Sequence, residues 1–122
     1  MFKISSNGIV TVNRGDSFEF PVTLNIGSAL ASVVYKLSET DVLYLGIMEP
    51  NQPFETAIIR KRFDYKDLDE DGNINIRFWP EDTECLLPGK YYYQIKLKTV
   101  DAKTGRDDVE TVVDKTLFYI QE

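Results

Sequence analysis

The sequence predicts an all-β protein, and specifically an antiparallel β-sandwich of about seven or eight strands. Apolar residues recur with a period of two along most of the chain, whereas an amphipathic helix requires a period near 3.6. Short segments rich in glycine, proline, asparagine and aspartate separate these runs, as in sandwiches and barrels. The 122 residues are 43% apolar and 12% aromatic, so a chain of this length can bury a core without disulfides. We therefore treat residues 1–122 as a single domain.

The first two expected strands lie on either side of a tight turn. They cover Ile9–Asn13 and Ser17–Leu24, and the turn is Arg14-Gly15-Asp16. This tripeptide is also an adhesion motif for some receptors, but glycine and aspartate are typical turn residues, and we favour the turn. Pro21 cannot donate to a β-ladder, so we expect its strand to be an edge strand or to be bulged there. An exposed edge can recruit a partner strand.

The middle of the chain contains one ambiguous segment and two clearer ones. Ser28–Leu37 fits either a short helix capped by Ser28 or a strand through Ser32–Tyr35, and we favour the strand. Val42–Met48 alternates apolar and more polar residues and is predicted as a strand. Ala57–Phe63 is expected to be another.

The C-terminal half begins with a hairpin signal and ends with two strands. Asp71-Gly72 precedes an alternating run at Asn73–Trp79 and predicts a hairpin turn. Pro80–Glu84 suits one helical turn, with proline near its start and acids near the positive end. Strands are then expected at Tyr91–Lys98 and Thr111–Ile120.

Charge and cysteine content exclude several classes of function. The chain has 14 basic and 20 acidic residues, a net charge of −6, which argues against general nucleic-acid binding because that requires a basic surface. A basic protein partner stays open. The single cysteine, Cys85, allows no internal disulfide. No segment is apolar enough to span a membrane and no signal peptide is recognisable, so we expect folding in a cytoplasm.

The residue inventory also disfavours catalysis. Histidine is absent, which removes the Ser-His-Asp and Cys-His arrangements and the usual general base. Cys85 follows an acidic turn that disfavours its thiolate, so we expect a buried or inert thiol. Glycoside hydrolysis requires two carboxyl groups facing each other across a cleft, and nothing in the sequence identifies such a pair. We expect no enzymatic activity and no required cofactor.

One acidic segment resembles part of a calcium loop. Asp67, Asp69 and Asp71 alternate and precede Gly72, and oxygen ligands at such spacing suit a hard cation. However, the twelfth position is Phe78, where a calcium loop of this type needs a bidentate glutamate. We favour a solvated acidic turn and keep a weak, structural calcium site at the three aspartates as the alternative.

The aromatic residues divide into two rows. Tyr91 and Tyr93 belong to the apolar row of their strand, whereas Tyr92 and Trp79 lie on the opposite rows of theirs. Aromatic residues on an outer face can form an interface or a platform for sugar stacking. They can equally pack against a second sheet, which we favour. The candidate interface residues are therefore Trp79, Tyr92 and Pro21.

Several segments, in order and spacing, resemble one family of small structural proteins from tailed bacteriophages. They are Val12–Phe20, Glu39–Ile47, Phe54–Lys61, Ile74–Thr83 and Leu87–Leu97. The arrangement is similar to the immunoglobulin-like N-terminal domain of siphophage baseplate upper proteins. It is also similar to short stand-alone virion proteins of phages that infect Gram-positive hosts.

The resemblance implies an immunoglobulin-like sandwich that serves as a non-enzymatic building block of a virion and is made in the bacterial host cytoplasm. It implies other phage structural proteins as partners, a multicopy or homo-oligomeric state, and neither nucleic acid nor membrane. The sequence stops at Glu122, without the helical or receptor-binding regions that often follow the baseplate domain. This departure counts against a baseplate position and leaves head-decoration, tail-accessory and adaptor roles open. We expect docking at the edge near Pro21 and at the loops Glu49–Pro53 and Asp101–Asp108.

Two other functions stay open from the sequence. One is a glycan- or host-surface-binding module that uses Trp79, Tyr92 and calcium at Asp67–Asp71. The other is an acidic phage-encoded inhibitor of a host nuclease, which would need its carboxylates on one face, whereas the strand pattern scatters them.

Overall fold

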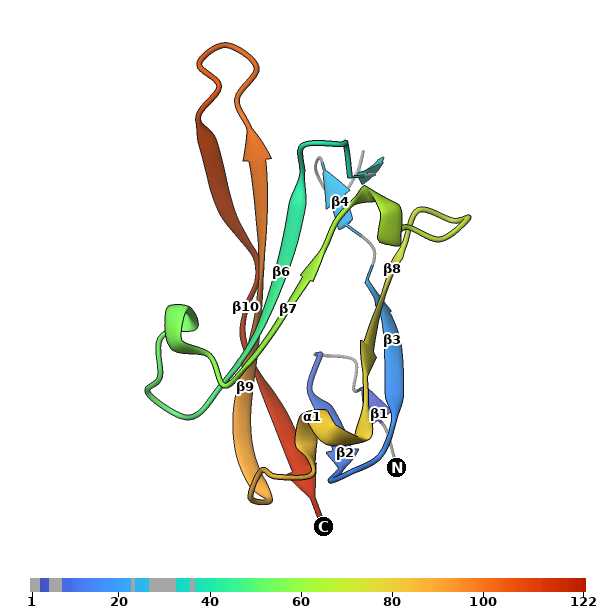
Figure 1. Ribbon diagram of the computed structural model, residues 1–122, viewed down its shortest axis with the longest axis vertical. Coiled ribbons are helices and arrows are strands. Elements are labelled where there is room, and N and C mark those ends of the chain that lie inside the picture. Colours follow the sequence, from blue (N-terminus) through green and yellow to red (C-terminus); the bar gives the residue numbers. More distant parts are fainter. Residues whose placement is uncertain (1–2, 5–7, 23, 27–32, 36) are drawn as a thin grey trace.

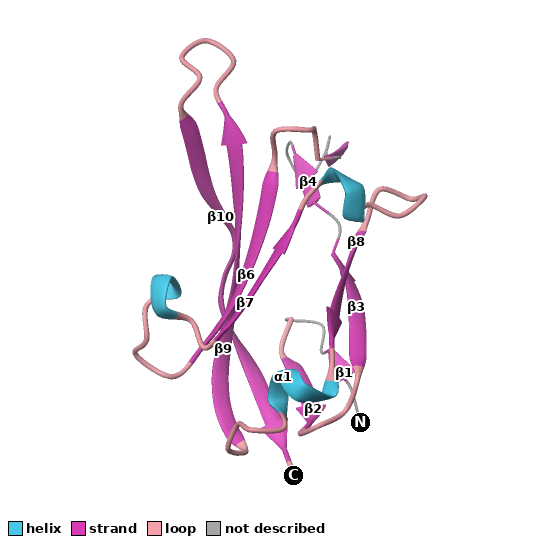
Figure 2. Cartoon of the chain, viewed as in Figure 1, coloured by secondary structure: helices cyan, strands magenta, loops and turns pink. Residues whose placement is uncertain are grey.

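The computed structural model describes residues 3–4, 8–22, 24–26, 33–35 and 37–122. These residues form ten strands, one α-helical turn and two 3-10 turns, which confirms the predicted all-β class (Figures 1 and 2). The strands are β1 (Lys3–Ile4), β2 (Val10–Asn13), β3 (Phe18–Val22), β4 (Leu24–Ile26), β5 (Val33–Tyr35), β6 (Val42–Met48), β7 (Ile59–Phe63), β8 (Ile74–Phe78), β9 (Gly89–Val100) and β10 (Asp107–Gln121). The helical turns are η1 (Phe54–Thr56), η2 (Tyr65–Asp67) and α1 (Pro80–Thr83). None of the helices in the described segments is long or apolar enough to cross a bilayer.

Six strands form the larger sheet, in the order β1-β2-β10-β9-β6-β7. Its neighbours are antiparallel except β2 and β10, which run parallel. The prediction of a purely antiparallel arrangement is therefore wrong at this pair. The two strands lie near opposite ends of the chain, so no tight hairpin dictates their relative direction.

Two antiparallel ribbons complete the described structure. One pairs β3 with β8, and the other pairs β4 with β5. The β3–β8 ribbon stands across from the six-stranded sheet, with α1 at its lower end (Figure 1). Among the described strands β3 pairs only with β8, which agrees with the prediction that Pro21 lies in an edge strand.

The core lies between the six-stranded sheet and the β3–β8 ribbon. Its buried residues come from β2, β3, β6, β7, β8, β9 and β10, together with Leu37 from the segment before β6. Phe18 and Phe78 stack across the ribbon with ring centroids 4.6 Å apart. The Phe118 ring, from the larger sheet, lies 5.7 Å from that of Phe78. This aromatic contact joins the two layers of the core.

The predicted apolar rows face this core. In β8 the residues Ile74, Ile76 and Phe78 are buried, and in β9 Tyr91 and Tyr93 are buried. The β9 residues between them are only half-buried. The alternation therefore identified the inward face of both strands correctly.

The Asp71-Gly72 turn does not join two paired strands, so the hairpin prediction is wrong. β7 belongs to the six-stranded sheet and β8 to the ribbon, and the chain crosses between layers here. What remains of a hairpin is a single bridge between Leu68 and Ile74. Gly72 has φ of +82°, a left-handed conformation that glycine adopts without a steric penalty.

The sequence predicted the positions of most other elements correctly but underestimated the lengths of the last two strands. The strand favoured within Ser28–Leu37 is β5, and the proline-led helical turn is α1. The strand expected at Ser17–Leu24 is divided between β3 and β4, which belong to different ribbons. β9 and β10 are 12 and 15 residues long. Their last pairs, Thr99 with Asp108 and Val100 with Asp107, lie beyond the final pairing of β9 with β6 at Lys98. This projecting segment, 99–108, is called the arm (top of Figure 1).

Candidate functional site

The outer face of the β3–β8 ribbon holds two of the three predicted interface residues. Because the inward row of each strand is buried in the core, the alternate residues point outward. The ribbon face, as we call it, consists of Glu19, Pro21, Asn75, Arg77 and Trp79. Glu19 pairs with Arg77, and Pro21 pairs with Asn75. The structure thus brings Pro21 and Trp79 onto one surface.

Trp79 dominates this surface. Its side chain is 52% exposed, and its ring stacks on the Arg77 guanidinium, with Cζ 4.5 Å from the ring centroid. The Arg77 Nη1 lies 3.8 Å from Glu19 Oε2. The Arg77 Nε is buried and has no hydrogen-bond partner within the described structure. A buried donor without an acceptor costs free energy. The hydrogen-bonding capacity of Arg77 is therefore not fully used at this surface.

The backbone of Trp79 is fixed by the first turn of α1. Its N–H donates a 2.7 Å hydrogen bond to Asp82 Oδ2, and Pro80 follows at the first helical position. The same Asp82 oxygen accepts a hydrogen bond from Lys61 Nζ at 2.9 Å. Lys61 belongs to β7, so this ion pair ties α1 to the six-stranded sheet. The indole is therefore presented on a rigid base, which reduces the entropy lost on binding a partner.

Tyr92 lies on the other layer of the molecule. It occupies the outward row of β9, where it pairs with Met48 of β6 and Leu117 of β10. Trp79 and Tyr92 therefore face away from the core on opposite sides, and the structure does not bring them together. Tyr92 is only half-buried, whereas the neighbouring Met48 is fully buried.

The three aspartates of the predicted calcium site do not converge. Over the ranges that the structure covers, no group of three or more acidic, cysteine or histidine side chains is close enough to hold a metal ion. Asp69 accepts hydrogen bonds from the backbone N–H groups of Asp71 and Asn73, both at 2.9 Å. Asp67 Oδ2 instead accepts from the Asp64 N–H at 2.9 Å. The carboxylates order a turn because short aspartate side chains satisfy backbone donors locally.

Asp69 is the organising residue of this turn. The pKa of the Asp69 carboxyl lies below its usual value of 3.8, mainly because the backbone N–H of Asn73 donates a hydrogen bond to it. Asn75 Nδ2 also donates to Asp69, at 3.3 Å, which connects the turn to the ribbon face. Hydrogen bonds to a carboxylate stabilise its charged form. We call residues 67–72 the acidic loop.

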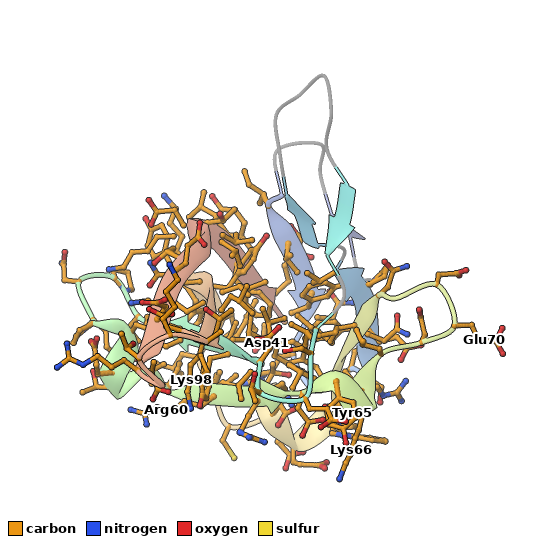
Figure 3. All side chains as sticks on the ribbon, turned by 90° about the horizontal axis from the view of Figure 1, so that it is seen from above. Asp41, Arg60, Tyr65, Lys66, Glu70 and Lys98 are labelled. Carbon is orange, nitrogen blue, oxygen red and sulfur yellow. The ribbon has the colours of Figure 1, made fainter. Side chains whose placement is uncertain are left out.

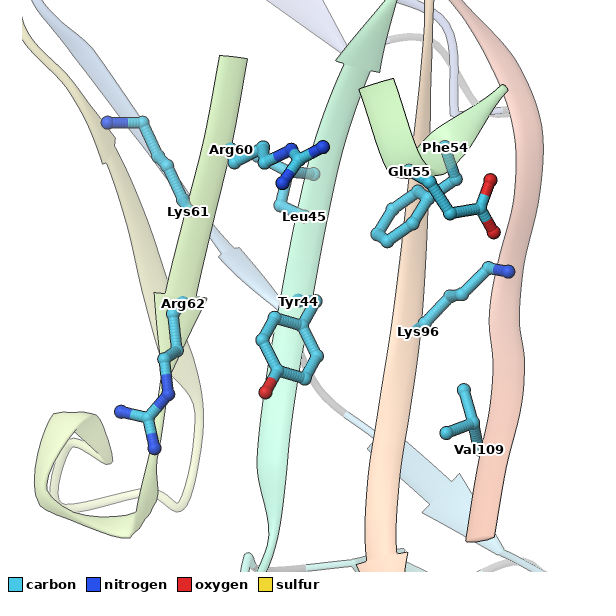
Figure 4. Close-up of a pocket in the computed structure, with 9 residues that line it drawn as sticks. All are labelled: Tyr44, Leu45, Phe54, Glu55, Arg60, Lys61, Arg62, Lys96 and Val109. Carbon is cyan, nitrogen blue, oxygen red and sulfur yellow. The ribbon is translucent and has the colours of Figure 1, made fainter. Parts of the chain in front are cut away.

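A groove that sequence reasoning missed lies on the outer face of the six-stranded sheet. The outer groove has a volume of about 480 Å³ and is lined by residues of β6, β7, β9, β10 and η1 (Figure 4). Tyr44 on β6 pairs with Arg62 on one side and Lys96 on the other. Arg60 also lines the groove. Cations therefore flank an aromatic ring, although the whole chain is acidic.

The wall of the outer groove is formed by Phe54 of η1, which packs over Gly46. A Cβ atom at Gly46 would lie only 2.8 Å from the Phe54 ring. The Lys96 ammonium lies 4.9 Å from the centroid of the same ring. The absence of a side chain at position 46 thus lets η1 close over the sheet, and Phe54 in turn positions Lys96.

The sequence did contain a signal for this groove. Arg60 and Arg62, like Lys96 and Lys98, are separated by two positions and so project from the same face of a strand. Recognising the groove also required knowing that β6 lies between these strands. That order is a property of the tertiary structure and is not encoded in either strand alone.

Cys85 follows α1 and is exposed. Of the predicted buried or inert thiol, burial is therefore wrong, and an inert thiol stays a prediction. The acidic residues of the chain occupy several separated places, including the acidic loop, α1 and the arm. This distribution does not give the single acidic face expected of a nucleic-acid mimic.

No known protein family, curated protein or solved structure matches this chain. Its function is therefore inferred from the ribbon face, the outer groove and the sequence pattern.

Proposed function

We propose that this protein is a non-enzymatic structural component of a tailed-phage particle, with an immunoglobulin-like sandwich fold, that acts by docking to neighbouring proteins of the virion. Two kinds of support converge on this proposal. The ordered sequence segments resemble small virion proteins, and the exposed residues have the character of a protein interface. The particle position implied by the resemblance is a baseplate, tail-accessory or head-decoration site.

The observation that carries the proposal is the Arg77–Trp79 pair on the ribbon face. Tryptophan and arginine are the residue types most enriched among those that dominate binding energy at protein interfaces. Here the two stack at 4.5 Å, and Trp79 remains 52% exposed. A partner that covered the exposed indole would bury apolar area directly beside the stacked guanidinium.

The arm offers a second contact region. Residues 102–108 of the arm are exposed throughout. Next to the arm, the apolar side chain of Val109, which also lines the outer groove, is 63% exposed. Two paired strands that extend past the sheet place such residues away from the core (Figure 1). Several weak contacts of this kind, repeated around a symmetric particle, reinforce one another because attachment at one site raises the effective concentration at the next.

Docking is better supported than glycan binding. A sugar platform built from Trp79 and Tyr92 requires both rings on one surface, and they lie on opposite layers. Calcium assistance requires the aspartates at positions 67, 69 and 71 to converge, and within the described structure they belong to no metal-binding group.

Mass spectrometry of purified virions tests the proposal directly. We expect this chain in particles of the phage that encodes it, at a copy number that reflects the particle's symmetry. A phage carrying Trp79→Ala should incorporate the protein less than wild type. Leu87→Ala, at a residue that is 77% exposed outside the ribbon face, should leave incorporation unchanged. Absence of the wild-type chain from purified particles would refute the proposal.

A further inference from the structure

The outer groove contains cations without partners. Within the described residues no ion pair involves Arg60 or Lys96, and the Lys96 ammonium lies over the Phe54 ring. One carboxylate, that of Glu55, also lines the groove, against the four cations Arg60, Lys61, Arg62 and Lys96, of which Lys61 is paired with Asp82. Arg62 has a loose ion pair with Asp64 at 3.7 Å, and its side chain is 59% exposed. The chain has six more acidic than basic residues, so unpaired cations beside two aromatic rings define a surface suited to a negatively charged partner.

The acidic loop is complementary to this groove. Four of its six residues are acidic: Asp67, Asp69, Glu70 and Asp71. Asp69 orders the backbone through its hydrogen bonds, and Asp67 binds back to Asp64. The carboxylates of Glu70 and Asp71 have no ion pair or hydrogen bond within the described structure. The loop therefore presents two free charges on a fixed turn, and little conformational entropy remains to be lost on binding.

Within one molecule the tip of the acidic loop and Arg60 of the groove lie far apart (Figure 3). Glu70 lies at the tip of the acidic loop, well away from Arg60 and Lys98 (Figure 3). The groove lies on the outer face of the larger sheet, whereas the loop leaves the end of its edge strand β7 and leads to β8 of the ribbon (Figures 1 and 4). A loop–groove contact therefore has to join two copies of the chain.

We propose that the acidic loop of one copy docks in the outer groove of a second copy, with Glu70 and Asp71 facing Arg60, Arg62 and Lys96. The two contact surfaces are different, so each copy keeps one free loop and one free groove. Such a head-to-tail interface repeats and generates a closed ring or an open filament. This inference deepens the proposed function and rests on it for its biological setting, because a repeated contact is what a virion component needs.

The contact should be electrostatic in character. Most of its charged groups lie at the surface, where screening acts strongly. We therefore expect association that strengthens as salt is lowered and that is largely lost at about 0.5 M salt, where the screening length falls to a few ångströms.

Sedimentation velocity of purified chains with exchanged charges tests the proposal. The groove variant carries Arg60→Glu and Lys96→Glu, and the loop variant carries Glu70→Lys and Asp71→Lys. Each variant alone should self-associate at least about tenfold more weakly than wild type, because like charges then face each other. An equimolar mixture should associate again, since the acidic groove of one variant meets the basic loop of the other. Lys90→Glu, at an exposed residue outside the groove, the acidic loop and the arm, changes the net charge half as much as the groove variant does and should behave as wild type.

Two results would overturn the inference. One is a wild-type chain that stays monomeric at several hundred micromolar in low salt. The other is a groove variant that associates as tightly as wild type while circular dichroism shows both to be folded. Because the experiment uses purified protein, it is independent of virion content. A chain that self-associates but is missing from particles would refute the proposed function alone, and a monomeric chain found in particles would refute only this interface.

Discussion

The backbone N–H of Gly15 donates a 2.9 Å hydrogen bond to the side-chain hydroxyl of Thr83, which lies 68 positions away in the chain. Thr83 is fully buried and ends α1, whereas Gly15 lies in the first tight turn with φ of +81°. The bond thus joins the turn after β2 to the helical turn that supports Trp79. The Arg-Gly-Asp tripeptide accordingly serves as a structural turn, as its residue types predict.

Replacing Thr83 with valine should destabilise the protein by about 1–3 kcal/mol, because the shape is kept while the Gly15 N–H loses its acceptor. Chemical denaturation monitored by tryptophan fluorescence measures this, since Trp79 is the single tryptophan and lies next to α1. Thr83→Ser keeps the hydroxyl and should recover most of the lost stability. Equal stability of the valine variant and wild type would show that this hydrogen bond contributes little.

Gly46→Ala should also destabilise the protein, by about 1–3 kcal/mol, because the added methyl group overlaps the Phe54 ring. The Cβ would lie 2.8 Å from that ring and 3.2 Å from the Ala57 Cβ. Removing the ring with Phe54→Ala should make the alanine at position 46 better tolerated. Thermal unfolding of both single variants and the double variant gives the coupling energy, and strictly additive effects would contradict the predicted contact.

Alkaline conditions should destabilise the fold through two buried tyrosines. Burial raises the pKa of Tyr93 and of Tyr91 above the usual 10.0, and the charge of Glu49 adds to the effect on Tyr91. The unfolded chain therefore releases these protons first. The stability that they contribute is complete below pH 10 and is lost as the pH rises through the folded-state values.

The Tyr93→Phe variant separates this titration from the hydrogen bond. The Tyr93 hydroxyl donates to the Gly8 carbonyl at 2.6 Å, so the variant should lose about 1 kcal/mol at neutral pH. Its stability should then fall less steeply than that of wild type above pH 10. Unfolding free energies from pH 7 to 11 measure both effects, with Tyr65→Phe as the control for an exposed phenol. An unchanged alkaline slope would refute the role of Tyr93.

Asp69→Ala should loosen the acidic loop without unfolding the core, because the loop is exposed and the affected hydrogen bonds are local. Amide hydrogen exchange at Asp71 and Asn73 should become faster, whereas exchange in β8 and β9 should be unchanged. The pKa of Asp69 is lowered from 3.8, so in wild type the same loosening should appear as the pH falls below 4 through the folded-state value. Protection of these amides that is unaffected by the substitution would contradict the assigned role of Asp69.

Much of the fold could be predicted because it depends on local pattern. The alternation in Ile74–Phe78 and Gly89–Leu97 determined which residues face the core, since a strand buries every second side chain. Pro80 and the acids after it determined a helical turn at α1. The same parity determined the row that Trp79 occupies, but the favoured packing of its ring against a second sheet was wrong, because Trp79 is 52% exposed.

Other features were decided only by the tertiary structure. The partition of Asp67 and Asp69 between separate hydrogen bonds depends on where the chain crosses between layers. The sequence favoured a solvated acidic turn and left a weak calcium site at the three aspartates as the alternative. The separation of Trp79 from Tyr92, and the meeting of Arg62, Tyr44 and Lys96, both depend on strand order. A strand's own sequence sets which of its residues share a face, because that is a local consequence of its geometry. It does not set which strand lies beside it, because pairing between distant segments is fixed by how the whole core packs.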